Sequence, residues 1–423
     1  MKNNAANKLK QVPTECLVIG IDPHKSKHAA VAMTQDYNIC CKFKFDNSRA
    51  GFIMAVERLR DEMIKAGCKN IMFAIETGGH YWRNFAYFLD ENDIPFRFIN
   101  QYSLKRRREG KDLNRRKNDY RDSEVAAEML CTGEFTESKL RQGIYAELLA
   151  THNNYRRLIK ERTRTINLIK GLLDGLFPEF TRVFKDPCGK TALGVLAACP
   201  IPREIACMTD KDFMIKVRTN YSGRLGKNKL FALKLVANTS SGVAAGAKAV
   251  SIELKFLVEK LRLIQCQLQR VEEALVELVD QSEEGKYLLS VRGLSYIAIA
   301  GLIAELGCFK VYRCAKQMIK MAGSNPSEKE SGGKRSSHTP MSKHGRPGLR
   351  YVGWIAVIPM LRLNADFQAW AKQRRERPVN ANPLSGREVL GAALNRLLRL
   401  VFALVKNKAY YRDSRPELAL AGV

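Results

Sequence analysis

A heptad repeat in the second half of the chain is the feature that most constrains the fold. Apolar residues recur over residues 250–278 at alternating spacings of four and three, for about four heptads. The a positions are all leucine and the d positions are mixed: Leu254, Leu261, Leu268 and Leu275, then Leu257, Ile264, Val271 and Leu278. This pattern predicts one long helix with an apolar stripe that another helix must cover. We expect a coiled coil between copies of the chain; the alternative is packing against the chain's own domain.

The first third of the chain alternates strand and helix patterns. Short apolar runs at 16–22, 28–33, 39–45, 71–76 and 94–100 predict strands, and residues 51–66 and 80–92 read as helices. Three early strands followed by alternating helices and strands predict a mixed α/β sheet. The order resembles that of a ribonuclease-H-like fold.

The rest of the chain reads as mainly helical. Residues 147–177 are helical and basic, residues 180–245 are less regular, and helical patterns return from 287 onwards. We expect a flexible basic N-terminus (1–14), an α/β domain (15–145), a helical linker with the coiled coil (146–284), a mainly α C-terminal domain (285–410) and a tail (411–423). A length of 423 residues fits two or three domains of ordinary size.

The charge balance points to a polyanionic partner. The chain carries 71 Lys and Arg against 43 Asp and Glu, a formal charge of +28, which favours nucleic acid or an anionic membrane surface. The longest apolar runs, 296–304 and 352–361, are about half the ~20 residues that a membrane-spanning helix needs. The N-terminus has no apolar signal-peptide core, and the 11 cysteines include no CxxC pair. We therefore expect a cytoplasmic protein without a structural zinc site, associated with the nucleoid.

Four acidic residues form a candidate metal site. Asp22 and Glu76 each end a predicted strand, and Asp119 and Asp122 stand three residues apart, on one face of a predicted helix that Asp119 could cap. If sheet and helix bring them together, four carboxylates cannot all stay ionised without cations, and oxygen ligands favour Mg²⁺ or Mn²⁺. Taken singly, such acids are more often turn or capping residues.

Basic residues gather near these acids and in the helical region. We predict nucleic-acid contacts along residues 105–117, in the basic helix and in a later loop: Lys105, Arg106, Arg107, Arg108, Arg115, Arg116, Lys117, Arg156, Arg157, Lys334, Arg335 and Lys343. Lysine and arginine charge of this kind contacts the phosphate backbone and does not read sequence.

Residues 324–348 form a loop rich in Gly, Ser, Lys and Arg. From composition alone this is a flexible basic linker. The functional interpretation is that a serine hydroxyl attacks phosphorus while neighbouring cations neutralise the developing charge.

Several segments, in order, resemble the DEDD-type insertion-sequence transposases, a family that includes the Piv-like DNA invertases and the bridge-RNA-guided recombinases. They are GIDPHKSKH, AIETGGHYW, KNDYRDSEVA, VRGLSYIAIAGLIAELG, ESGGKR and MSKHGRPGLR. The resemblance implies a RuvC-like N-terminal domain whose metal-binding tetrad is Asp22, Glu76, Asp119 and Asp122. It also implies that Ser331 is the nucleophile, with Ser342 as the second candidate. This chain departs from the family pattern in its GIDPHK run, where many relatives have a small or apolar residue before the lysine.

The resulting hypothesis is a DNA transposase or site-specific recombinase with a metal-assisted serine nucleophile. The resemblance further implies double-stranded DNA as substrate, a homo-oligomer and, in one branch, a guide RNA. Two alternatives remain open at this point. One is a Holliday-junction-resolvase-like endonuclease in which the carboxylates act alone, and the other is a non-enzymatic coiled-coil scaffold that binds nucleic acid.

Overall fold

Two units make up the chain, Met1–Leu140 and Arg141–Val423, and each is described by itself. The computed structural model describes residues 7–111, 118–136, 140–220, 225–327, 330–331, 334–335, 340–378 and 383–413, with backbone alone at residues 220, 330–331 and 334–335. The finer division of the second unit near residue 285 stays a prediction.

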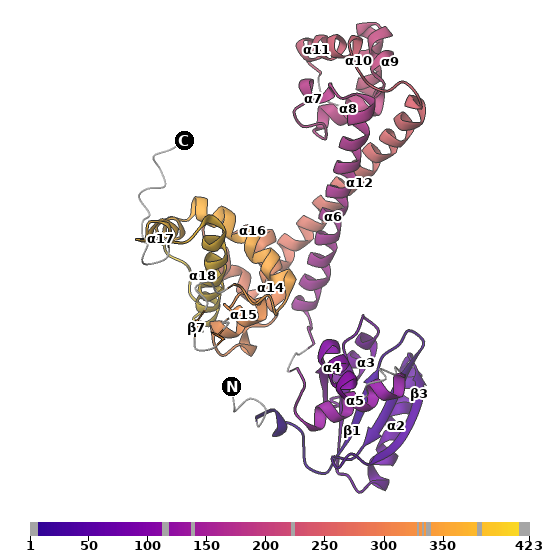
Figure 1. Ribbon diagram of the computed structural model, residues 1–423, viewed down its shortest axis with the longest axis vertical. Helices are drawn as coiled ribbons and strands as arrows, with labels where there is room; N and C mark the ends of the chain where they lie inside the picture. The colour runs from indigo at the N-terminus through magenta and orange to yellow at the C-terminus, as the bar shows by residue number, and fades with distance from the viewer. Residues whose placement is uncertain are drawn as a thin grey trace. The chain divides into compact units, whose positions relative to one another are not determined.

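A five-stranded mixed sheet is the centre of the first unit (Figure 1). Its strands are β1 (Cys16–Asp22), β2 (Lys27–Met33), β3 (Ile39–Asp46), β4 (Asn70–Glu76) and β5 (Phe96–Ile99), in the order β3-β2-β1-β4-β5. The first three strands pair antiparallel, whereas β4 and β5 continue the sheet parallel to β1. The mixed α/β sheet is confirmed, and its arrangement is compatible with a ribonuclease-H-like domain.

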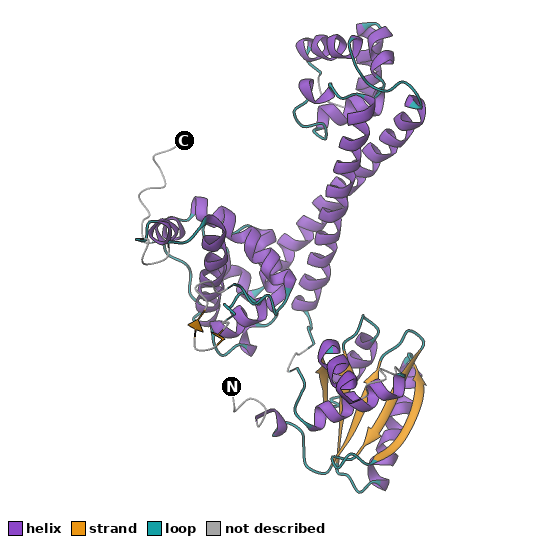
Figure 2. Cartoon of the chain, in the orientation of Figure 1, coloured by secondary structure: helices purple, strands orange, loops and turns teal. Residues whose placement is uncertain are grey.

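Helices cover both faces of this sheet (Figure 2). Alternate residues of β1 point to opposite faces. Ile19 and Ile21 pack with α2 (Arg49–Lys65) and α3 (Trp82–Glu91), whereas Val18 packs with α5 (Asp119–Cys131) and α4 (Gln101–Lys111). The near-continuous apolar run of β1 follows from this burial on both sides.

Gly20 allows α5 to approach β1 unusually closely. A Cβ atom at Gly20 would lie 1.7 Å from the carbonyl oxygen of Ser123 and 2.8 Å from the amide nitrogen of Ala127. The Ser123 hydroxyl donates a hydrogen bond of 3.1 Å to the carbonyl oxygen of Ala29 on β2. The first turn of α5 is thereby held against the sheet.

In the second unit, α6 (Ile144–Leu176) and α12 (Ala247–Gln281) run side by side in opposite directions (Figure 1). Leu148 of α6 shares a core with Leu275, Leu158 with Leu268, and Leu173 with Leu254. The predicted long helix is confirmed. Its four a-position leucines are buried within this unit, so the seam packs against the chain's own helix.

Residues 180–245, where the sequence pattern is less regular, contain short helices. Five helices form there around a core that also takes in the ends of α6 and α12: α7 (Phe180–Val183), α8 (Lys190–Ala198), α9 (Pro202–Cys207), α10 (Asp210–Asn220) and α11 (Lys227–Asn238). Most of these helices are too short to show a helical period, since none has more than 12 residues.

The remaining elements are α13 (Glu283–Leu288), α14 (Tyr296–Leu306), η1 (Phe309–Val311), α15 (Ala315–Ala322), β6 (Glu330–Ser331), β7 (Lys334–Arg335), α16 (Pro347–Leu363), α17 (Ala365–Arg375) and α18 (Gly386–Lys406). Helix α14 is buried between α6, α12 and α16. Gly301 makes this possible, because a Cβ atom there would lie 2.7 Å from Nε2 of His152 on α6. Among the described residues, no helix has both the length and the apolar character to span a membrane.

Replacing Gly20 should loosen the first unit. In Gly20→Ala the new methyl group meets backbone that cannot move aside, so we expect a loss of about 3 kcal/mol. Gly110→Ala, within α4 and with open space at its Cβ position, is the matched control and should be neutral or stabilising by up to about 1 kcal/mol. Calorimetric unfolding of both variants measures the difference, and equal transition temperatures would contradict the packing argument.

Two buried histidines should make the protein sensitive to acid. Burial lowers the pKa of His28 and of His152 from 6.5 to about 4, aided at His152 by Arg156. Below pH 6.5 the unfolded chain takes up these protons before the folded chain does. Stability should therefore be unaffected above about pH 6.5 and fall between pH 6.5 and 4, by about 1.4 kcal/mol per pH unit for each histidine. Urea unfolding across this range tests it: His152→Met should flatten the slope, and an unchanged slope would contradict the assignment.

Candidate metal centre

Two parallel strands end side by side and place the first two acids. Strands β1 and β4 are paired in register, Ile21 opposite Ile75, so Asp22 and Glu76 follow at neighbouring strand ends. Both residues are buried, with 8% and 7% of their surface exposed. The parallel pairing makes this edge of the sheet acidic.

Helix α5 brings the other two acids to the same edge. Asn118, not Asp119, caps the helix, since its side chain accepts a hydrogen bond from the amide of Tyr120. The predicted capping role of Asp119 is therefore wrong. Asp122, one turn further on, is 3% exposed. Asp22, Glu76 and Asp122 each offer a carboxylate oxygen within 4.8 Å of the other two.

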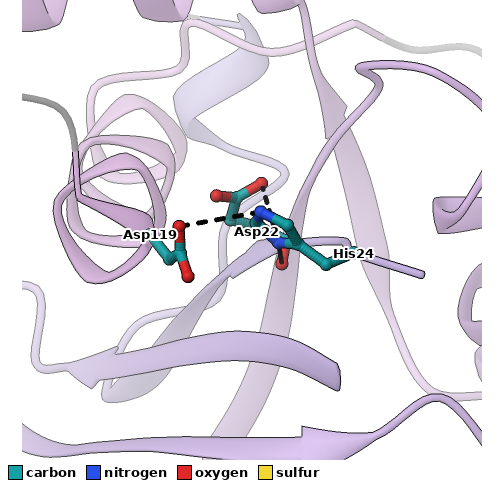
Figure 3. Close-up of side chains that lie close together, drawn as sticks. All are labelled: Asp22, His24 and Asp119. Atoms are coloured by element: carbon teal, nitrogen blue, oxygen red, sulfur yellow. Dashed lines mark hydrogen bonds and ion pairs between the residues drawn. The ribbon is translucent and has the colours of Figure 1, made fainter. Parts of the chain in front are cut away.

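Asp119 belongs to a second group, which it forms with Asp22 and His24 (Figure 3). Nε2 of His24 lies 3.6 Å from Oδ1 of Asp119, and Nδ1 lies 3.8 Å from Oδ1 of Asp22. Lys44 of β3 pairs with the other oxygen of Asp119 at 2.6 Å, and this hydrogen bond raises the pKa of the lysine. His24 was not among the predicted site residues. The sequence offered one indication of its role: His24 follows the strand-ending acid Asp22 by two residues.

An internal cation faces the buried acids. The guanidinium of Arg108 on α4 pairs with Asp122, and both side chains are largely buried. Arg107 pairs with Glu134, and Lys111 pairs with Glu128. These cations of the predicted nucleic-acid segment are therefore engaged within the domain.

Two further cations of α4, Lys105 and Arg106, are exposed. Lys105 lies near Glu109 at 3.8 Å, and the Arg106 guanidinium lies over the Tyr102 ring at 4.8 Å. A pocket of about 380 Å³ opens here, lined by residues of both charges: Glu76, Asp122, Lys105, Arg108, Gln101, Tyr102 and Leu104. The predicted contacts Arg115, Arg116 and Lys117 lie outside the described residues.

The predicted cations of the second unit also differ in their surroundings. Arg156 lies 3.5 Å from the buried carboxylate of Glu305 and over the ring of Tyr351. Arg157 is exposed and donates a hydrogen bond to the side-chain oxygen of Asn154. Lys343 is exposed as well. Of these three side chains, Arg157 and Lys343 are accessible to a phosphate backbone.

In the described parts of the serine loop, backbone hydrogen bonds join the two sides of the loop. Ser327 and Pro340 share a backbone hydrogen bond, as do Ser342 and Asn325, and β6 pairs with β7 so that Ser331 lies opposite Lys334. The Ser342 hydroxyl is 3.0 Å from the side-chain oxygen of Asn325 and 3.3 Å from the carbonyl oxygen of Gly323. These contacts give Ser342 a role in holding the base of the loop. Ser331, Lys334 and Arg335 are described by backbone alone.

Comparison with known proteins places these features in a family. A DEDD-type transposase model matches residues 19–178, and a model described as the transposase IS116/IS110/IS902 family matches residues 285–372. The "insertion element IS116 uncharacterized 44.8 kDa protein" of Streptomyces clavuligerus is 21% identical over 415 residues, covering 94% of this chain and 96% of the relative.

A carboxylate domain followed by a second transposase segment defines a DNA transposase, an enzyme that binds DNA and transfers phosphodiester bonds. The chain belongs to the DEDD-type insertion-sequence transposases of the IS116/IS110/IS902 family. The resemblance seen in the sequence motifs is thereby confirmed.

Removing the internal cation should strengthen metal binding. In Arg108→Gln the three buried carboxylates lose their counter-charge, so a divalent ion should bind roughly tenfold more tightly, about 1.4 kcal/mol, while the metal-free protein becomes less stable. Titration calorimetry with Mn²⁺ measures the affinity. Arg106→Gln, on the same helix but exposed, is the matched control and should leave it unchanged. An unaltered affinity in Arg108→Gln would show that Arg108 does not compete with the ion.

Proposed function

We propose that this transposase cuts and rejoins the DNA of an insertion sequence through a covalent serine–DNA intermediate, at a centre that binds divalent metal. The observation that carries the proposal is the convergence of Asp22, Glu76 and Asp122, three buried carboxylates with oxygens within 4.8 Å of one another. Buried acids at this spacing repel one another unless cations are present.

The donor set supports Mg²⁺ or Mn²⁺ as the cofactor. Carboxylate oxygens are the ligands that these hard ions prefer, and the pocket beside them has room for a phosphate group. Asp22 belongs to both acidic groups and is the residue that two ions would share. Bound ions would neutralise charge on the phosphodiester oxygens. Glu76, Asp119 and Asp122 would hold them together with Asp22, and Lys105 lines the pocket that would receive the phosphate.

Ser331 is the proposed nucleophile. Its hydroxyl loses a proton as its oxygen forms a bond to phosphorus, the P–O ester bond of the strand breaks, and the leaving oxygen takes up a proton in balance. The bond energy stays in the serine–DNA ester for the rejoining step. Lys334, Arg335 and Lys343, close to it in sequence, neutralise the phosphate. The hydrogen bonds of Ser342 to the loop base favour Ser331 over Ser342 for this role.

A basic and aromatic pocket supports a second nucleic-acid partner. It encloses about 600 Å³ between α17 and α18 and is lined by Trp370, Arg374, Arg396 and Arg399, among others. The guanidinium groups of Arg374 and Arg396 lie 5.8 Å and 5.4 Å from the Trp370 ring centre. Arginine and tryptophan side chains grouped in this way can stack on unpaired bases. We propose that the pocket binds part of a guide RNA, and that the complex acts on chromosomal DNA at the nucleoid.

The protein is also proposed to act as a homo-oligomer, but through a surface other than the heptad seam. The seam is covered by α6. On the opposite side of α12, Ile252, Phe256 and Leu263 are more than half exposed and follow a helical spacing. This second stripe is the candidate contact between copies.

A covalent adduct assay tests the proposed chemistry. Purified protein, RNA from the element's flank, Mg²⁺ and end-labelled duplex carrying the element's junction should give a protein–DNA adduct that resists boiling on a denaturing gel. Ser331→Ala should abolish the adduct, because no other group would form the ester. Ser342→Ala is the matched control in the same loop and should retain it. Asp22→Asn should lower adduct formation at least about a thousandfold.

The resolvase-like alternative makes the opposite prediction. If the carboxylates hydrolyse DNA alone, Ser331→Ala leaves free cut ends at the parent rate and no adduct forms in any variant. That result would overturn the serine mechanism while leaving the metal centre in place.

A further inference from the structure

His24 lies where a nitrogen ligand for a metal ion would lie. Its two ring nitrogens face the carboxylates of Asp22 and Asp119, which come from different elements, the end of β1 and the start of α5. One ligand atom from each of the three residues lies within 4.8 Å of the others. Figure 3 shows the imidazole beside the two acids, with a dashed contact to each.

The contacts of the ring favour one tautomer. Nδ1 lies 3.4 Å from the backbone carbonyl oxygen of Asp22. A proton on Nδ1 directed at this oxygen leaves the lone pair on Nε2, the nitrogen that faces Oδ1 of Asp119. Histidine ligands commonly donate their other N–H to a backbone carbonyl in this way. Lys44 occupies Oδ2 of Asp119, so Oδ1 is the oxygen that faces the histidine.

The backbone of His24 is anchored to a buried residue. Its N–H donates a hydrogen bond of 3.1 Å to Nδ1 of His28. His28 is fully buried and stacks on Phe52. This anchor reduces the freedom of the turn after β1, so His24 presents its ring to the acids at a lower entropic cost than a free loop residue would.

We propose that His24 is a metal ligand, which completes with Asp22 and Asp119 a second ion site beside the all-carboxylate group of Asp22, Glu76 and Asp122. The inference rests on the proposed metal centre and specifies it further. One ion then has a nitrogen ligand and the other has protein oxygens alone. Imidazole suits Mn²⁺ better than Mg²⁺, so the His24 site discriminates between the two ions and the carboxylate site does so less.

Pulsed electron paramagnetic resonance of the Mn²⁺-loaded full-length protein tests this without an activity measurement. Coordinated imidazole nitrogen modulates the electron spin echo of Mn²⁺, so the parent protein should show ¹⁴N modulation. His24→Gln should remove the modulation and weaken one of two Mn²⁺ binding events at least about tenfold. His80→Gln, at the other exposed histidine of this unit, is the matched control and should keep the signal.

A labelling experiment keeps the test independent of any variant. Incorporation of [¹⁵N]histidine into the parent chain should replace the ¹⁴N pattern with the ¹⁵N pattern. Mn²⁺ binding without nitrogen modulation, or modulation that survives in His24→Gln, would overturn the inference alone. No Mn²⁺ binding by the parent protein would overturn the proposed metal centre together with it.

Discussion

The close contact between α5 and β1 at Gly20 is the constraint on which the site depends. Only a residue without a side chain admits the Ser123 carbonyl so near the strand. Because the helix lies this close, its first turn reaches the ends of β1 and β4 and not the open face of the sheet. Asp122 is thereby buried beside Asp22 and Glu76. A packing feature in the middle of a strand thus sets the geometry of the acids at its end.

This arrangement concentrates negative charge where water is scarce, and cations of the same domain pair with the acids. The largely buried Arg108 pairs with Asp122, whereas the exposed Lys44 pairs with Asp119. Part of the basic segment that marks the chain as a nucleic-acid binder therefore balances acids within the domain. In the proposed metal centre an incoming divalent ion would compete with Arg108 for Asp122, and a released Arg108 would then be free to meet the phosphate that arrives with the ion. Charge balance links metal binding to substrate binding in this way.

The sequence predicted the elements whose signal is local and missed the features that depend on tertiary contacts. Apolar runs ending in Asp22 and Glu76 located the strands, and the Asp119–Asp122 spacing was enough to place both acids on one helix face. The heptad repeat predicted α12 but could not identify its partner, since periodicity reports a stripe that must be buried and not which helix covers it. His24 and the pairing of Arg108 with Asp122 were missed because both depend on tertiary contacts of α5, with the sheet and with α4, which no local pattern encodes.

The burial of the carboxylates bears on the choice between transfer and hydrolysis. A hydrolytic centre must admit and activate a water molecule, whereas a centre that serves a protein nucleophile has to hold the phosphate and neutralise its charge. Three acids under 10% exposed, beside a pocket lined with Lys105 and Arg108, are better suited to holding a phosphodiester than to handling free water. In the proposed mechanism the two tasks are divided: the first unit supplies charge neutralisation, and the serine loop supplies the bond that preserves the energy of the broken strand. A transposase gains from this separation, because DNA ends held as esters can be rejoined without an external energy source.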